Sequence, residues 1–158
     1  MADAIRAVAA MGLQQRLDLA DRVHAEQPTL LYSVLVMQRF GATMAQIEVL
    51  IEVLLVVFTA MKVAGGKWPV ITEELQERCL ARVVGRARFI EGLDAPQVDA
   101  AVKDATLGHP QAPLLAYAVD AMRCQGWLGI KDDTQKHLVL TGLNLVECVA
   151  EAATRRKR

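Results

Sequence analysis

The segment 43–64 constrains the fold more than any other feature, because it is apolar around nearly its whole circumference. At about 100° per residue on a helix, its polar side chains fall into one narrow stripe that includes Glu48, Glu52 and Lys62. A helix of this kind must be covered by neighbours on almost every side. We therefore expect it either at the centre of a helical bundle or in a seam between subunits. The residues predicted for the core are Leu50, Ile51, Leu54, Phe58 and Met61.

Turn-forming residues divide the chain into helical segments. Gly12 is predicted to bend or break a first helix over 3–26, and Pro28 stands where the first turn of a second helix needs no N–H donor. Thr43 with Gln46 forms a capping-box pattern that opens the central helix. No stretch alternates apolar and polar residues for long enough to predict a strand. The other helices are expected at 28–40, 72–93, 95–107, from Pro113 to just before Gly126, and 133–154.

The chain is therefore predicted to be one all-α domain, 1–158, built as a compact bundle of six or seven helices. One internal similarity stands out, because 28–41 can be laid on 113–126 with six of fourteen positions identical, including both tyrosines of the chain. A duplication would give two similar three-helix halves, 1–66 and 70–154, related by a pseudo-twofold axis. The alternative is a chance match, because helix punctuation favours Pro and Gly at the same places in both segments.

Composition and charge exclude several classes of protein. With 158 residues and 53% hydrophobic content, the chain is long enough for a folded core and too apolar to be disordered. Basic and acidic side chains are equal in number, 18 of each, which argues against nucleic acid as the main partner. The most apolar run, 53–61, is shorter than the ~20 residues of a membrane-spanning helix, so no membrane is expected. The predicted location is the cytoplasm, where Cys79, Cys124 and Cys148 would behave as small buried hydrophobes.

Glu48 and Glu52 lie four residues apart on the central helix and raise the question of a carboxylate-bridged metal site. Such sites also use Glu-x-x-His motifs on facing helices, and the sequence contains none. His137 is the third candidate ligand, but it lies on a different predicted helix. We therefore expect no bound metal and no cofactor, and we interpret Glu48 and Glu52 as part of a solvated or salt-bridged stripe.

The last predicted helix aligns His137, Thr141, Asn144, Cys148 and Glu151 on one face, a set that includes the residue types of thiol-dependent enzymes. Cys148 and His137 are about 16 Å apart along a straight helix, so they cannot form a nucleophile–base pair with each other. No phosphate-binding loop, H-E-x-x-H or nucleophile-elbow motif occurs in the chain. We therefore predict no catalytic residue and interpret this face as a polar surface exposed to solvent.

Arg78, Arg82 and Arg86 follow one another at four-residue spacing on one predicted helix. Arginine stems can lie along apolar surface while the guanidinium groups reach carboxylates on another element. We expect an ion-pair ladder with Glu48 and Glu52, since the two helices are consecutive and predicted to be antiparallel. The alternative is a surface that binds anions or nucleic acid.

These observations favour a non-enzymatic cytoplasmic interaction or regulatory protein that acts through helix-mediated self-association. A homo-oligomer is the expected assembly, and a separate protein partner is the other option. One alternative function is a DNA-associated regulator that uses the Arg78–Arg88 face and the basic C-terminal tail, 155–158. Another is a small-ligand or metal-binding bundle with a pocket near His137 or near Glu48 and Glu52. The candidate interaction residues are Leu54, Phe58, Trp68 and Trp127.

Overall fold

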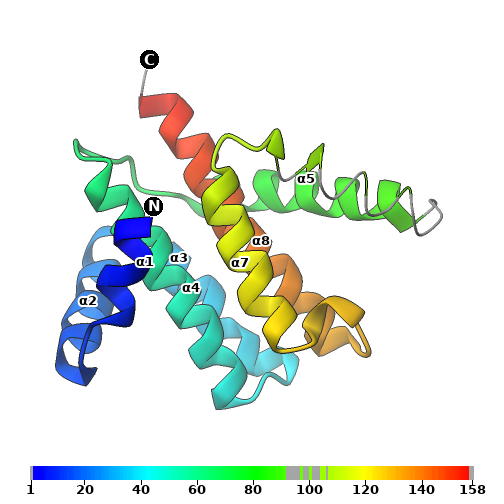
Figure 1. Ribbon diagram of the computed structural model, residues 1–158, viewed down its shortest axis with the longest axis horizontal. Helices are drawn as coiled ribbons and strands as arrows, with labels where there is room; N and C mark the ends of the chain where they lie inside the picture. Colours follow the sequence, from blue (N-terminus) through cyan, green and yellow to red (C-terminus); the bar gives the residue numbers. More distant parts are fainter. Residues whose placement is uncertain (1, 92–96, 98–99, 101–103, 106, 157–158) are drawn as a thin grey trace.

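The helices begin and end close to the residues that the sequence marks as breaks. The computed structural model describes all residues except 1, 92–96, 98–99, 101–103, 106 and 157–158. The predicted helix 95–107 therefore falls largely outside the described residues, as does the end of the basic tail. The described elements are α1 (Ala2–Ala9), α2 (Leu13–Glu26), α3 (Pro28–Leu35), the 3-10 helix η1 (Val36–Phe40), α4 (Met44–Val63), α5 (Glu73–Glu91), α7 (Ala112–Cys124), the 3-10 helix η2 (Trp127–Gly129) and α8 (Asp133–Arg156) (Figure 1). The described part of the chain contains no strand, so the all-α prediction is confirmed.

Two of the predicted helix starts are present with their contacts. Gly12 separates α1 from α2, and its N–H donates to Gln15 Oε1 at 2.9 Å. Before α4, Thr43 Oγ1 accepts from the Gln46 N–H at 3.3 Å, and Gln46 Oε1 accepts from the Thr43 N–H at 2.9 Å. This reciprocal pair is a capping box, and it satisfies N–H groups that a helix start otherwise leaves unpaired. The predicted break at Gly12 and the predicted start of the central helix are both confirmed.

The segment 28–40 differs from the single helix expected there. Pro28 occupies the first turn of α3 as predicted, but the helix tightens into the 3-10 turns of η1 before it ends. Gly41 follows at φ +86°, a left-handed conformation that favours glycine. A Cβ at Gly41 would lie only 3.1 Å from Thr134 Oγ1, and this hydroxyl donates to the Phe40 carbonyl oxygen at 2.8 Å. The turn therefore ties η1 to the start of α8.

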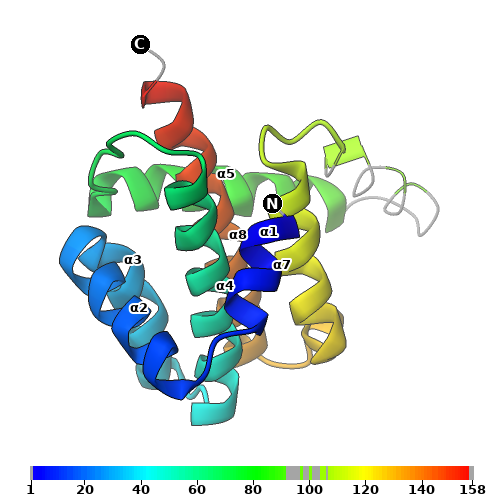
Figure 2. The ribbon, with the colours of Figure 1, turned by 60° about the vertical axis from the view of Figure 1, so that its left-hand side comes forward.

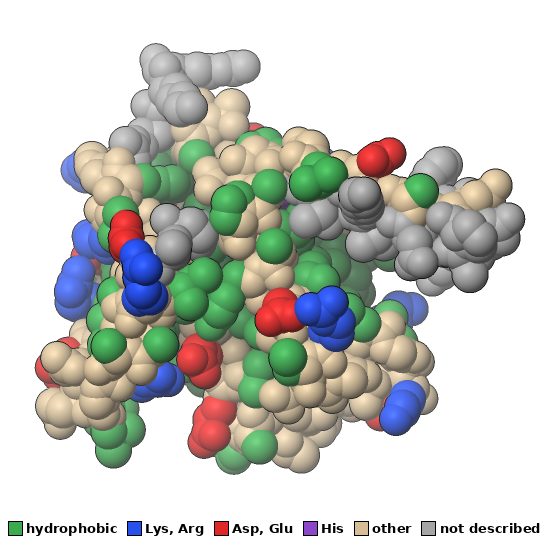
Figure 3. All heavy atoms as spheres, viewed as in Figure 1, with side chains coloured by type: hydrophobic (Ala, Val, Ile, Leu, Met, Phe, Trp, Pro, Cys, Tyr) green, Lys and Arg blue, Asp and Glu red, His purple; other side chains and the backbone are tan. Residues whose placement is uncertain are grey.

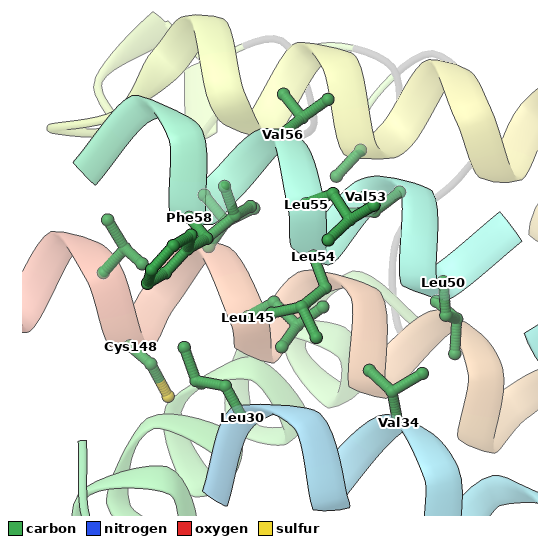
Figure 4. Packing of buried hydrophobic residues seen from close by; sticks show 14 of the residues in the cluster. Leu30, Val34, Leu50, Val53, Leu54, Leu55, Val56, Phe58, Leu145 and Cys148 are labelled. Carbon is green, nitrogen blue, oxygen red and sulfur yellow. The ribbon is translucent and has the colours of Figure 1, made fainter. Parts of the chain in front are cut away.

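α4 lies at the centre of the bundle, which confirms one of its two predicted settings. It contacts α1, α2, α3, α7 and α8. Figure 2 shows α2 and α3 on one flank of α4 and α7 on the other, with α1 lying across it. Of the predicted core residues, Leu50, Leu54, Phe58 and Met61 are at most 2% exposed, whereas Ile51 is only half-buried. In Figure 4, Leu54 packs close to Leu145 of α8, with Leu30 of α3 below.

The length and composition of α4 also meet the criteria for a membrane-spanning helix. Among the described residues, Met44–Val63 is the one helix that meets them, and half of its most apolar window is buried inside the protein. The central helix of a soluble bundle satisfies the same two criteria, so this feature alone is weak evidence for a membrane span.

α8 is the second central helix, and it contacts α3, α4, α5, α7, η1 and η2. Gly142, near the middle of α8, allows α4 and α7 to approach this helix closely. A Cβ added at Gly142 would lie 2.8 Å from Met122 Sδ on α7 and 3.5 Å from Leu50 Cδ2 on α4. The glycine therefore leaves the space on α8 that the side chains of Met122 and Leu50 occupy.

The two segments of the internal similarity end in the same way. Gly41 at φ +86° is the last residue of the first segment, and Gly126 at φ +71° is the last residue of the second. Each is followed by one of the two central helices, α4 and α8. A single cluster of buried hydrophobic residues includes side chains from α1, α2, α3, η1, α4, α5, α7 and α8. The duplication and the pseudo-twofold axis stay predictions.

Candidate functional site

A groove lies along α8, with α3 and η1 on one side and α5 on the other. Its volume is about 450 Å³, which is within the range of small-ligand sites. α8 provides the floor, because it contacts the elements on both sides. The groove is lined by Thr29, Tyr32, Ser33, Val36, Met37, Phe40, Glu73, Gln76, Glu77, Leu80, His137, Leu140, Thr141 and Asn144.

The connection 64–72 joins the two walls of the groove at one end. Gln27, only 2% exposed, accepts from the Ile71 N–H at 2.9 Å and donates to the Pro69 carbonyl oxygen at 3.0 Å. The Thr29 hydroxyl donates to the Ile71 carbonyl oxygen. Because α5 begins two residues after Ile71, these bonds fix the start of α5 relative to the start of α3.

The η1 side of the groove is apolar and aromatic. The Phe40 ring lies against the His137 imidazole, with ring centroids 4.6 Å apart and planes inclined by 32°. Phe40 is 46% exposed, so a molecule in the groove has access to this pair. In the same wall, the Thr141 hydroxyl donates a hydrogen bond to Met37 Sδ at 3.2 Å. A flat or aliphatic group would find apolar contacts here.

The α5 side of the groove is acidic. Glu73 and Glu77 lie four residues apart on α5, and both are exposed. Neither Lys nor Arg occurs among the described lining residues, so the lining is negatively charged. Asn144 Nδ2 donates to the Gln76 carbonyl oxygen at 3.2 Å. Gln76 Nε2 and His137 Nδ1 are buried and have no hydrogen-bond partner in the described protein, a condition that is uncommon in folded proteins.

A second polar cluster lies farther along α8 and is centred on Glu147, a carboxylate with only 6% of its residue surface exposed. Arg86 Nη1 pairs with Glu147 Oε1, and Arg82 Nη2 lies 3.9 Å from Glu147 Oε2 and 3.2 Å from Glu151 Oε2. His109 Nε2 lies 3.3 Å from Glu147 Oε1, while its Nδ1 accepts a backbone N–H two residues along at 3.0 Å. The cluster therefore fastens α5 and the chain before α7 to α8.

The side chains around Glu147 lower the pKa of its carboxyl group. Burial on its own would raise the pKa, but hydrogen bonds from His109 and Arg86, together with their charges, lower it from 4.5 to about 2. A strongly shifted carboxylate can mark an active site. Here the side chains that hydrogen-bond to it are cations or donors from other elements, so we interpret Glu147 as a structural ion-pair centre.

Two of the three arginines of the expected ladder form ion pairs in the described structure, but the partners expected for them are wrong. Arg82 and Arg86 pair with carboxylates of α8 and not with Glu48 or Glu52. Glu52 lies 3.8 Å from Arg16 Nη2, and Glu48 is exposed on α4. The physical reason is that α5 packs against α8, although α4 precedes it in the chain.

The prediction that one face of α8 is open to solvent is also wrong. Cys148 is fully buried and Asn144 is 9% exposed, because α5 covers this side of the helix. His137 and Thr141 are half-buried in the groove. The rest of the helix surface is also largely apolar, and this pattern indicates a helix with no wide exposed face.

Most of the predicted interaction residues belong to the core. Leu54, Phe58 and Trp127 are at most 3% exposed, so they have no free surface for a partner. Trp68 is half-buried and packs against the same core. The expectation of three buried cysteines is wrong for Cys124, which is exposed at the end of α7.

The structure does not bring the candidate metal ligands together. Glu48 and Glu52 are on α4, whereas His137 lies in the groove on α8. Within the described part of the chain, no group of three or more His, Cys, Asp and Glu side chains is arranged to hold a metal ion.

Sequence reasoning did not single out Phe40, Glu73 and Glu77 in the groove, or His109 and Glu147 in the ion-pair cluster. These residues come from separate elements, and no local motif connects them. A partial signal was available for Glu147, which is the one charged residue in the segment 138–150 of the last helix.

No family model matches the chain, and no similar protein is found among curated proteins or solved structures. The function is therefore inferred from the geometry of the groove.

Proposed function

We propose that this protein is a non-enzymatic binding protein whose groove takes a small organic cation with an apolar body. The observation that supports this proposal is the division of the groove lining into an apolar, aromatic side and an acidic side. A ligand with a hydrocarbon or aromatic body and one ammonium group complements both sides at once.

The apolar body would lie against the Phe40–His137 pair and the aliphatic side chains near it. Phe40 offers an aromatic face, and Met37 offers a deformable thioether below it. The volume of about 450 Å³ suits a ligand of small-molecule size.

The cationic group would lie near Glu73 and Glu77. Both carboxylates are exposed, so water and salt screen them, and each contributes less than ~1 kcal/mol to binding. We therefore expect a modest affinity that falls as the salt concentration rises.

The test is isothermal titration calorimetry with three compounds that share one skeleton: phenylbutylammonium, phenylbutanol and phenylbutyrate. The ammonium compound should bind more tightly than the alcohol, and the carboxylate should bind most weakly. The Glu77→Gln variant should weaken binding of the ammonium compound by roughly twofold to fivefold and leave the alcohol unchanged, as expected for one screened charge.

Glu48→Gln is the matched control, because Glu48 is an exposed glutamate of α4 outside the groove. It should leave all three affinities unchanged. Equal binding of the three compounds, or no binding of any of them at millimolar concentration, would contradict the proposal.

Self-association is a second proposal, and the exposed face of α3 and η1 favours it. Tyr32, Leu35 and Phe40 are 54%, 44% and 46% exposed there. A contact between the α4 helices of two subunits is not needed to bury α4, because other helices of the same chain cover it. Sedimentation equilibrium should then show a species heavier than 17.3 kDa that Leu35→Glu dissociates and Leu13→Glu, on the exposed surface of α2, does not. A single species at 17.3 kDa would exclude this proposal.

We do not advance the DNA-binding alternative. Arg82 and Arg86 of the Arg78–Arg88 face already pair with carboxylates of α8. On the side of the molecule in Figure 3, acidic and basic side chains are interspersed among hydrophobic ones. A DNA-binding surface usually concentrates positive charge on one face.

A further inference from the structure

Two cysteines face each other between α5 and α8, outside the groove. Cys79 of α5 and Cys148 of α8 are both fully buried, and each thiol has the other among its side-chain neighbours. Arg82 Nη2, which donates to Cys79 Sγ, also lies 3.2 Å from Glu151 Oε2, three residues after Cys148 on α8. Figure 4 shows Cys148 on α8, with its sulfur among buried side chains of the core. The two residues are far apart in the sequence, so only the packing of α5 on α8 brings their sulfur atoms together.

The polar neighbours of the two thiols differ. Arg82 Nη2 donates to Cys79 Sγ at 3.3 Å, whereas the Cys148 thiol donates to Asn144 Oδ1 at 3.7 Å. The guanidinium group favours a negative charge on Cys79, and nothing comparable donates to Cys148 in the described structure. Cys79 is therefore the better nucleophile of the two.

We propose that Cys79 and Cys148 form a thiol–disulfide exchange site, which closes into an intramolecular disulfide between α5 and α8 when a low-molecular-weight disulfide is the oxidant. The Cys79 thiolate attacks one sulfur of the oxidant, forming a mixed disulfide and releasing one thiolate. The Cys148 thiolate then attacks Cys79 Sγ, forming the internal disulfide and releasing a second thiolate. The protein loses two protons and two electrons, and the oxidant is reduced to two thiols.

Burial makes the exchange slow at neutral pH. Desolvation raises the pKa of both Cys79 and Cys148, so only a small fraction of either thiol is ionised there. The rate should therefore rise as the pH increases, and it should rise further when α5 separates from α8 for a moment.

The disulfide would also alter one groove residue. Asn144 accepts from the Cys148 thiol and lines the groove, and it donates to the Gln76 carbonyl oxygen of α5. Oxidation removes the thiol hydrogen and with it one of the contacts that hold Asn144.

The experiment uses the full chain with Cys124→Ser, because the exposed Cys124 would otherwise react first. The protein is incubated with hydroxyethyl disulfide between pH 7 and pH 9, with and without urea below the unfolding midpoint. Intact mass should fall by two hydrogen atoms, digestion should give one cross-linked peptide pair with Cys79 and Cys148, and dithiothreitol should reverse both changes. The oxidised protein should have a higher urea midpoint.

Two further variants make the result decisive. Cys79→Ser and Cys148→Ser, each in the Cys124→Ser background, should give no loss of hydrogen and at most a mixed disulfide on the remaining thiol. If the chain with both cysteines gives only mixed disulfides, or keeps two free thiols at pH 9 in urea, the two sulfurs do not form the exchange site and the proposal is wrong.

Discussion

α4 and α8 are both central helices, but they are buried in different ways. α4 is enclosed mainly by hydrophobic contacts, and its charged residues Glu48 and Lys62 stay at the surface. α8 instead buries polar groups along its length, including Asn144 and Glu147. Each of these has a partner on α5 or before α7.

This difference between α4 and α8 indicates which of the two helices can contribute to a functional site. A helix such as α4 stabilises the bundle through apolar area and has no group that recognises a ligand. A helix such as α8 holds side chains that position other elements, and one side of it forms the floor of the groove. We therefore expect both helices to stabilise the fold through their buried hydrophobic side chains, and we place the chemistry of the protein along α8.

The largest expected effect tests the role of α4. Leu54→Ala should destabilise the protein by roughly 2–5 kcal/mol, because it removes a fully buried side chain and leaves a cavity. Leu145→Ala on α8 should cost a similar amount, and Leu17→Ala, at a position 51% exposed on α2, should cost far less. Urea denaturation of the three variants measures this. An unchanged midpoint for Leu54→Ala would show that α4 is peripheral.

The next effect tests the buried polar groups of α8. Glu147→Gln should cost about 2–3 kcal/mol at neutral pH, because the pKa of Glu147 is lowered from 4.5 to about 2 in the folded state. This contribution is present above the unfolded pKa of 4.5 and is lost as the pH falls towards about 2. Denaturation curves between pH 7 and pH 2 should therefore show the wild type and the variant converging. A difference that stays constant with pH would contradict the ion-pair interpretation.

A smaller effect compares the starts of the two helices. Thr43→Ala removes the cap of α4, and Asp132→Ala removes the acceptor for the Gln135 N–H, 2.7 Å away, at the start of α8. Each should cost about 1 kcal/mol, since side-chain caps contribute on this scale. Asp133→Ala is the control for α8. A cost for Asp133→Ala equal to that of Asp132→Ala would point to charge near the helix end and not to the cap itself.

The smallest effect concerns the charged end of α4. Lys62 Nζ lies 2.7 Å from Glu26 Oε2, and both side chains are more than 40% exposed. Lys62→Ala should therefore cost less than ~1 kcal/mol. A double-mutant cycle with Glu26→Ala isolates the pair, and a coupling well above that limit would show that α4 depends on surface charge after all.

The helix boundaries could be predicted because local residues determine them. Gly12, Pro28 and the Thr43 capping box act within a few residues of the chain, and each has the expected effect. The 3-10 end of α3 was not predicted, and its last residue accepts a hydrogen bond from Thr134 of α8, which is far away in the sequence.

The groove and the ion-pair cluster could not be predicted in the same way. They require knowledge that α5 packs on α8 and not on α4, and no local pattern determines this choice. The sequence showed that His137, Asn144 and Cys148 share one face of α8, but whether that face met solvent or another helix depended on the same choice. The apolar residues on the other faces of α8 were the sequence signal that this helix is buried.

The most direct test of this account is an NMR titration of the ¹⁵N-labelled protein with phenylbutylammonium, which compares the two central helices in one measurement. The account predicts saturable amide shifts along 73–80 and 137–144, on the two sides of the groove, and no shifts along the buried part of α4, 50–58. Shifts concentrated in α4, or weak shifts spread over the whole surface without saturation, would contradict the assignment of ligand binding to α8 and its groove.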